Sequence, residues 1–114
     1  MNTIQIDADG KAMLSDMIEA TRKIFNENWN DVGPFVEMES QHVLDSLSTI
    51  ARLKQEGSIS EEQARLQLVI QRDCFLSLLL TVKGIRRIQA ENAVNAALAV
   101  IRSSANRLLG WSLL

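Results

Sequence analysis

Residues 60–109 have the sequence SEEQARLQLVIQRDCFLSLLLTVKGIRRIQAENAVNAALAVIRSSANRLL, which contains no proline and a single glycine, Gly84. Ser60 suits an N-cap, because its hydroxyl can accept a hydrogen bond from a free backbone N–H. Gln63 lies at the position from which its side chain can bond back to the Ser60 N–H and complete a capping box. Two acidic residues after the cap favour the positive end of the helix dipole. The sequence therefore predicts a helix that begins at Ser60.

The two halves of this stretch differ in their hydrophobic pattern. The segment Cys74–Val82 is apolar on nearly all sides, which predicts a helix buried on most of its surface and Cys74 as a small buried hydrophobe. The segment Ile88–Leu109 has one apolar stripe that covers about a third of the helix circumference. That stripe consists of Ala90, Val94, Ala97, Leu98, Ile101, Ala105 and Leu108.

A spacing of seven relates Val94, Ile101 and Leu108, and the alanines around them allow another helix to approach closely. We therefore expect this helix to form a seam between two chains. The residues assigned to that interface are Ala90, Val94, Ala97, Leu98, Ile101, Ala105, Leu108 and Trp111.

Gly84 leaves two arrangements open. Lys83-Gly84 is typical of a helix end, but no Asn, Asp, Pro or Ser follows to build a loop. Either the chain reverses tightly at Gly84, or one helix runs on with a bend. A continuous helix would extend about 75 Å, at 1.5 Å per residue, and could cover its stripe only against another chain.

The first half of the chain predicts two further helices. Helical spacing of apolar residues covers about 11–30, Val32-Gly33-Pro34 is expected to break that helix, and a second helix covers about 34–56. Residues 1–10 are expected to form an extended or frayed lead-in. The predicted fold is a single all-α domain over 1–114, with three to four long amphipathic helices. Its architecture is an antiparallel bundle or an elongated helical hairpin, with a long bent C-terminal helix as the alternative.

Composition and charge exclude several classes of protein. With 46% hydrophobic and 23% charged residues, the chain is not intrinsically disordered. Residues 1–62 hold twelve acids and five bases (net −7), and 63–114 hold two acids and seven bases (net +5), which gives the total of −2. The seven bases are spread out rather than clustered, so we expect no nucleic-acid binding and instead expect acidic helices to pack against basic ones. A single cysteine and the absence of a signal-peptide pattern predict a cytoplasmic protein.

One arrangement resembles a metal-binding motif. Glu39 and His42 form a Glu-x-x-His pair of the kind that di-iron bundles use, but such sites need two pairs, and this chain has one histidine. Only a symmetric oligomer could supply the second pair, so His42 is expected to be solvated or interfacial. With no other catalytic pattern and no phosphate-binding loop, the chain is expected to be a non-enzyme without a cofactor.

The C-terminal sequence 108–114, LLGWSLL, is unusually apolar for a chain end. We expect it to dock on the bundle, on another subunit or at a membrane surface, with Trp111 as its anchor. The predicted function is a structural or protein-interaction module that forms a homo-oligomer, or binds a helical protein partner, through its C-terminal helix. The alternative is a peripheral membrane-surface protein that uses the basic C-terminal segment and the apolar tail.

Overall fold

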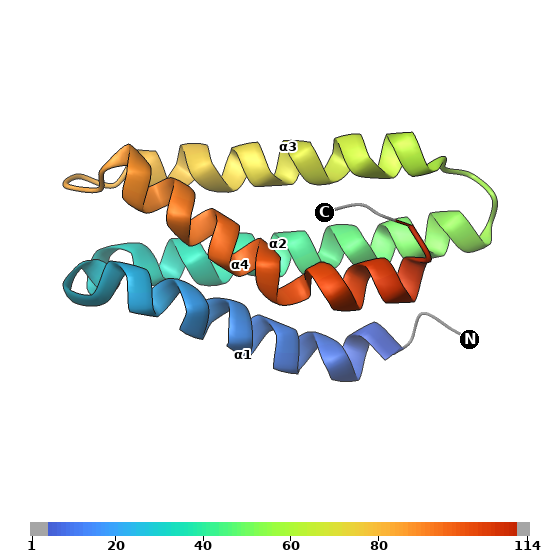
Figure 1. Ribbon diagram of the computed structural model, residues 1–114, viewed down its shortest axis with the longest axis horizontal. Helices are drawn as coiled ribbons and strands as arrows, with labels where there is room; N and C mark the ends of the chain where they lie inside the picture. The colour runs from blue at the N-terminus through green and yellow to red at the C-terminus, as the bar shows by residue number, and fades with distance from the viewer. Residues whose placement is uncertain (1–4, 112–114) are drawn as a thin grey trace.

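The computed structural model describes residues 5–111, and within them the side chains of 10–102, 105–107 and 109–111. The all-α prediction is confirmed: four α-helices form a bundle of about 44 × 26 × 18 Å (Figure 1). The elements in chain order are α1 (Gln5–Phe25), the short 3-10 helix η1 (Asn26–Asn28), α2 (Trp29–Gln55), α3 (Glu61–Leu80) and α4 (Arg87–Leu109).

The four helices do not contact one another equally. α4 packs most extensively against α1, and α3 packs mainly against α2. α3 and α4 are close together at the turn that joins them and diverge from there, so that α4 crosses toward α1 (Figure 1). As a result, α1, α2 and α4 surround most of the core, and α3 covers one side of α2.

The predicted start of α3 is confirmed. The backbone N–H of Gln63 donates to the Ser60 hydroxyl at 3.1 Å, and the Ser60 N–H donates to the Gln63 side-chain oxygen at 2.9 Å. Two of the backbone donors that a helix N-terminus leaves without partners are thus satisfied by one tetrapeptide. This local chemistry fixes where the chain turns from α2 into α3.

Gly84 forms a reversal and not a bend. α3 ends at Leu80, the Ile85 N–H donates to the Val82 carbonyl at 3.2 Å, and α4 begins at Arg87. Gly84 has a φ of +90°, a conformation that glycine adopts at little cost because it has no Cβ. Val82 and Ile85 pack against the core and hold the turn in place, so the long bent helix of 60–109 is not formed.

Two expectations for the first half are wrong. Residues 5–10 belong to α1 and are not an extended lead-in, and the chain bends at 26–28 instead of at 32–34. The bend is placed by Asn26, whose φ of 49° is one that asparagine tolerates better than most residues. Pro34 lies in the second turn of α2, where its missing N–H leaves only the carbonyl four residues earlier without a helix partner.

Gly33 lies inside α2, and the indole of Trp29 packs against it. A Cβ at position 33 would lie 3.0 Å from Trp29 Cε2 and 3.2 Å from its Nε1. The guanidinium of Arg22 sits 5.6 Å from the centre of the same ring, so Trp29 links the end of α1 to the start of α2. The glycine that suggested a helix end is therefore a site of close packing.

Replacing Gly33 by alanine tests this packing against a matched change at Gly10, which also lies within a helix. Gly10→Ala should stabilise the fold by up to about 1 kcal/mol, because alanine is the better helix former and nothing lies within 4 Å of the added Cβ. Gly33→Ala should instead destabilise it by about 1 kcal/mol, because the methyl group displaces the indole. Urea unfolding of both variants measures the difference. An equal gain in both would show that Trp29 does not pack against Gly33.

Candidate functional site

The residues assigned from sequence to an interface on α4 lie in the core of their own chain. Ala90, Ala97 and Ile101 have no exposed surface, and Val94, Leu98 and Ala105 are also buried. The side chain of Leu108 lies outside the described residues. Since the stripe already packs inside the single chain, mainly against α1, it has no free surface for a second chain. The prediction that these six buried residues of α4 form an interface between chains is therefore replaced: they belong to the core of their own chain.

Ile101→Asp distinguishes a core position from a seam between chains. In this structure Ile101 has no exposed surface, so an aspartate there would be a charge in an apolar interior without a partner. We expect the variant to lose helical circular dichroism and cooperative melting, as a core substitution does. A folded Ile101→Asp protein that differs from the wild type only in oligomeric mass would place Ile101 between chains.

Trp111 docks on the bundle. The ammonium group of Lys54, near the end of α2, lies 4.9 Å from the centre of the Trp111 ring. The same ammonium donates to the carbonyl of Leu109, which a helix C-terminus leaves without a partner inside the helix. Gly110 follows with a φ of +70° and turns the chain toward Lys54. Lys54 thus fastens the end of α4 to α2, a contact that no sequence pattern indicated.

The outer face of α3, defined here by Leu66, Ile70 and Cys74, is the apolar surface that the fold leaves open. Leu66 is 56% exposed, Ile70 is 52% exposed, and Cys74 is exposed. Their spacing of four places them along one side of the helix. The prediction that Cys74 is buried is therefore wrong.

The position of α3 in the bundle explains this exposure. Only Ala64, Leu68, Phe75 and Leu79 are buried on α3, at the spacing of a single helical stripe. α3 packs on α2 along that stripe and meets α4 mainly near the turn. In the apolar run that predicted burial on most sides, Phe75 and Leu79 are buried, Leu76 and Leu80 are partly buried against the core, and Cys74 is exposed. Of the five large hydrophobic residues exposed in the described part of the chain, three lie on α3 within five positions: Leu66, Val69 and Ile70.

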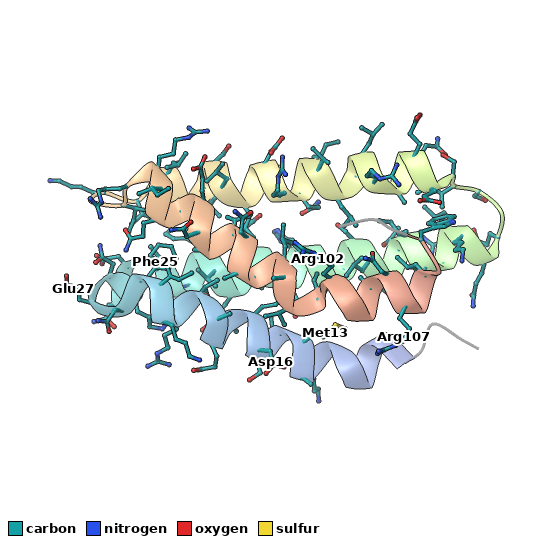
Figure 2. The ribbon with its side chains drawn as sticks, viewed as in Figure 1. Met13, Asp16, Phe25, Glu27, Arg102 and Arg107 are labelled. Atoms are coloured by element: carbon teal, nitrogen blue, oxygen red, sulfur yellow. The ribbon has the colours of Figure 1, made fainter. Side chains whose placement is uncertain are left out.

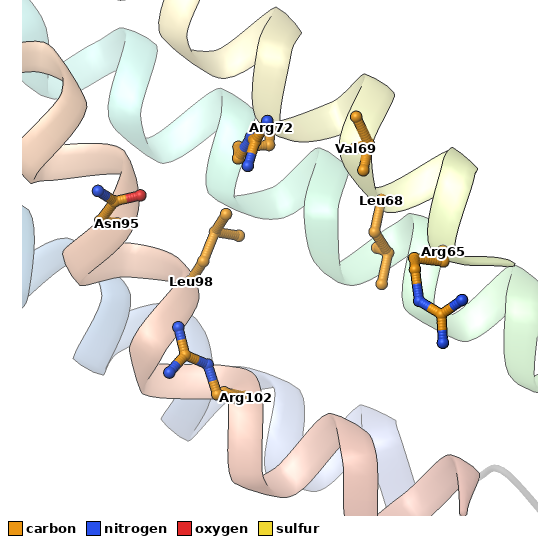
Figure 3. A pocket seen from close by; sticks show the side chains of 7 residues that line it. All are labelled: Arg65, Leu68, Val69, Arg72, Asn95, Leu98 and Arg102. Atoms are coloured by element: carbon orange, nitrogen blue, oxygen red, sulfur yellow. The ribbon is translucent and has the colours of Figure 1, made fainter. Parts of the chain in front are cut away.

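A second feature, the arginine groove, lies where α3 and α4 diverge (Figure 3). Its volume is about 230 Å³, and it is lined by aliphatic side chains, guanidinium groups and one side-chain amide. The residues that line it are Arg65, Leu68, Val69, Arg72, Asn95, Leu98 and Arg102. A shallow hollow of about 550 Å³ continues it toward the turn and shares Arg72 and Asn95 with it.

The three guanidinium groups of the arginine groove have different partners. Arg65 pairs with Glu61 one turn away at 2.8 Å, and Arg72 lies 3.5 Å from its neighbour Asp73. Arg102 is exposed and makes no hydrogen bond or ion pair with any residue in 5–111 whose side chain is described. These arginines are scattered along the sequence, since Arg102 lies 30 residues from Arg72, and their spacing therefore did not predict that they line one groove.

Glu39 and His42 contact each other as the Glu-x-x-His spacing predicts, but the described residues around them do not complete a metal site. Glu39 is buried, and its Oε2 lies 3.0 Å from Nδ1 of the exposed His42. Among the described side chains, no group of three or more His, Cys, Asp or Glu residues is placed to hold a metal ion. The pair therefore anchors an imidazole at the surface of α2, as one helix turn permits.

Within residues 5–111, no helix is long and apolar enough to cross a membrane. Comparisons with protein families, with curated proteins and with solved structures find no match for this chain. Two surfaces of the described chain are the candidates for function: the outer face of α3 and the arginine groove.

Proposed function

We propose that the protein is a non-enzymatic helical interaction module that self-associates, and that the outer face of α3 meets a second copy. The observation that carries this proposal is the exposure of Leu66 and Ile70 on the same side of one helix. Full burial of a large aliphatic side chain stabilises a protein by about 1.5–3 kcal/mol. Leu66 and Ile70 are about half exposed in the single chain, so they contribute only part of that free energy. A second chain that covers them would gain the remainder.

A second copy suits this face because the charges along α3 differ between its ends. Glu61 and Glu62 lie in the first turn of α3, and Lys83 and Arg86 lie in the turn beyond its end. When two copies of α3 pack antiparallel about a two-fold axis near Ile70, the acidic end of each helix lies beside the basic end of the other. Isologous contacts of this kind are the commonest in homodimers, and opposite charges at both ends favour one orientation.

Self-association also assigns a role to the helix that the fold buries least. α1, α2 and α4 form the core without needing the outer face of α3, so a second chain could bind there without any rearrangement of the bundle. Preformed surfaces bind with little reorganisation cost. The membrane-surface role predicted from the tail stays a prediction. It would require Trp111 to leave Lys54, whereas self-association requires no contact to break.

Ile70→Asp tests the proposal, with Ile88→Asp as its matched control. Both isoleucines are large and more than half exposed, at 52% and 58%, so neither change should unfold the chain. At a two-fold axis, Ile70→Asp removes buried apolar surface from both chains and places two carboxylates in the contact. We expect the wild type and Ile88→Asp to be dimers at micromolar concentration, and Ile70→Asp to dissociate at least a hundredfold more readily, a change of about 2.7 kcal/mol.

Size-exclusion chromatography with light scattering over a dilution series measures these masses, and circular dichroism checks that each variant is folded. A wild-type protein that remains monomeric at 100 µM would contradict the proposal. Equal dissociation of Ile70→Asp and Ile88→Asp would also contradict it, because it would show that α3 is not the contact.

A further inference from the structure

We infer that the arginine groove binds an amphipathic helix of a partner protein that carries carboxylate side chains along the edges of its apolar face. This inference is independent of self-association, because Leu66, Ile70 and Cys74 do not line the groove. The two surfaces lie on different sides of α3.

The shape of the groove fits an elongated ligand. α3 and α4 converge at their turn and diverge beyond it (Figure 1). The two hollows share Arg72 and Asn95 among their lining residues. Together they follow α4 from Ile88 to Arg102, about 21 Å at 1.5 Å per residue. That length matches four turns of helix. A helix laid into such a groove uses apolar side chains at every third or fourth position as its anchors.

The aliphatic residues that line the groove form an apolar surface on which the anchor side chains of the partner helix would pack. Leu68 and Leu98 project into the space between α3 and α4, and the 37%-exposed Val69 borders it (Figure 3). Leu68 and Leu98 are nearly buried, so they form a fixed floor that does not rearrange when a ligand binds. Leucine or isoleucine side chains of a partner helix would pack on this floor and displace water from it.

The charge of the groove selects acidic partners. Its first hollow is lined by three arginines and by no carboxylate, whereas the second is lined by Arg72 and Arg87 together with Asp73 and Glu91. The preference for carboxylates therefore belongs to the first hollow. Arg102 extends from α4 into the space facing α3, where Arg72 approaches from the other side (Figure 3). Guanidinium groups bind carboxylates through paired, charge-assisted hydrogen bonds, and Arg102 has no such partner among the described residues. A partner carboxylate in the first hollow would bind Arg102 directly, whereas Arg72 already has the Asp73 carboxylate 3.5 Å away.

Two synthetic helical peptides of 18 residues serve as probes. Both carry leucines at the spacing of one apolar face, and one has glutamates at its edges where the other has lysines. We expect the glutamate peptide to bind the wild-type protein, with an affinity that falls as salt is added, and the lysine peptide not to bind. Fluorescence anisotropy of labelled peptide at 50 mM and 300 mM salt measures both.

Arg102→Ala should weaken binding of the glutamate peptide about tenfold. The reason is that it removes the one guanidinium of the groove that has no carboxylate partner among the described residues. Arg107→Ala is the matched control, since Arg107 extends from a different side of α4 (Figure 2) and does not line the groove. Arg107→Ala should leave the affinity unchanged. Asn95→Glu places a carboxylate where the two hollows meet, and it should abolish binding of the glutamate peptide without disturbing the fold, because Asn95 is exposed.

Equal binding of the two peptides, or equal affinity of Arg102→Ala and Arg107→Ala, would overturn the inference. Binding to vesicles with anionic lipid that depends on Arg102, without binding of the glutamate peptide, would overturn it in favour of a lipid surface. The Ile70→Asp variant separates this inference from the proposed function. If that variant is monomeric and still binds the glutamate peptide, the groove acts on its own; if it loses the peptide, the groove is not an independent site.

Discussion

The structure depends on the close contact between α4 and α1. Ala90, Ala93 and Ala97 have no exposed surface, and their small side chains allow the backbone of a neighbouring helix to approach closely. α4 uses this stripe mainly against α1, and at its far end Lys54 of α2 binds the Leu109 carbonyl and covers Trp111. A helix held at both of these places cannot also lie along α3.

The divergence of α3 from α4 follows from that contact, and both candidate surfaces follow from the divergence. Because α3 packs on α2 alone for most of its length, a single stripe is enough to hold it, and the opposite side stays open. The same divergence opens the space in which Arg72 and Arg102 line one groove. Acidic helices of the first half were expected to pack against basic ones of the second, and α1 does pack against α4 and α2 against α3. The ion pairs Arg65–Glu61 and Arg87–Glu91 lie within single helices, between neighbours one turn apart.

The sequence predicted the features that depend on neighbouring residues. The N-cap at Ser60 was recognisable because both partners of the capping box lie within four positions, and the stripe on α4 was recognisable from its period. The helix break was placed at Val32-Gly33-Pro34 because glycine and proline are the usual signals. The chain turns earlier, at 26–28, where Asn26 has a positive φ. α2 runs through Gly33, against which Trp29 packs, and composition reveals neither feature.

The features that the sequence did not predict depend on which helices become neighbours. An apolar stripe has the same period whether it meets its own chain or another, so the burial of Ile101 against its own core could not be foreseen. For the same reason, the apolar run around Cys74 gave no sign that Cys74 itself would be exposed. The arginine groove joins residues about 30 positions apart, and only the antiparallel course of α3 and α4 brings them together.

Amide hydrogen exchange at two protein concentrations tests most directly whether α4 belongs to the core of its own chain and α3 to the contact between chains. Protection in 90–101 should be high and independent of concentration, because α4 is buried within each chain. Protection in 66–74 should increase with concentration, because a second copy stabilises the helix that it covers. A concentration-dependent gain in 90–101 with none in 66–74 would contradict the account, because it would place α4 between chains.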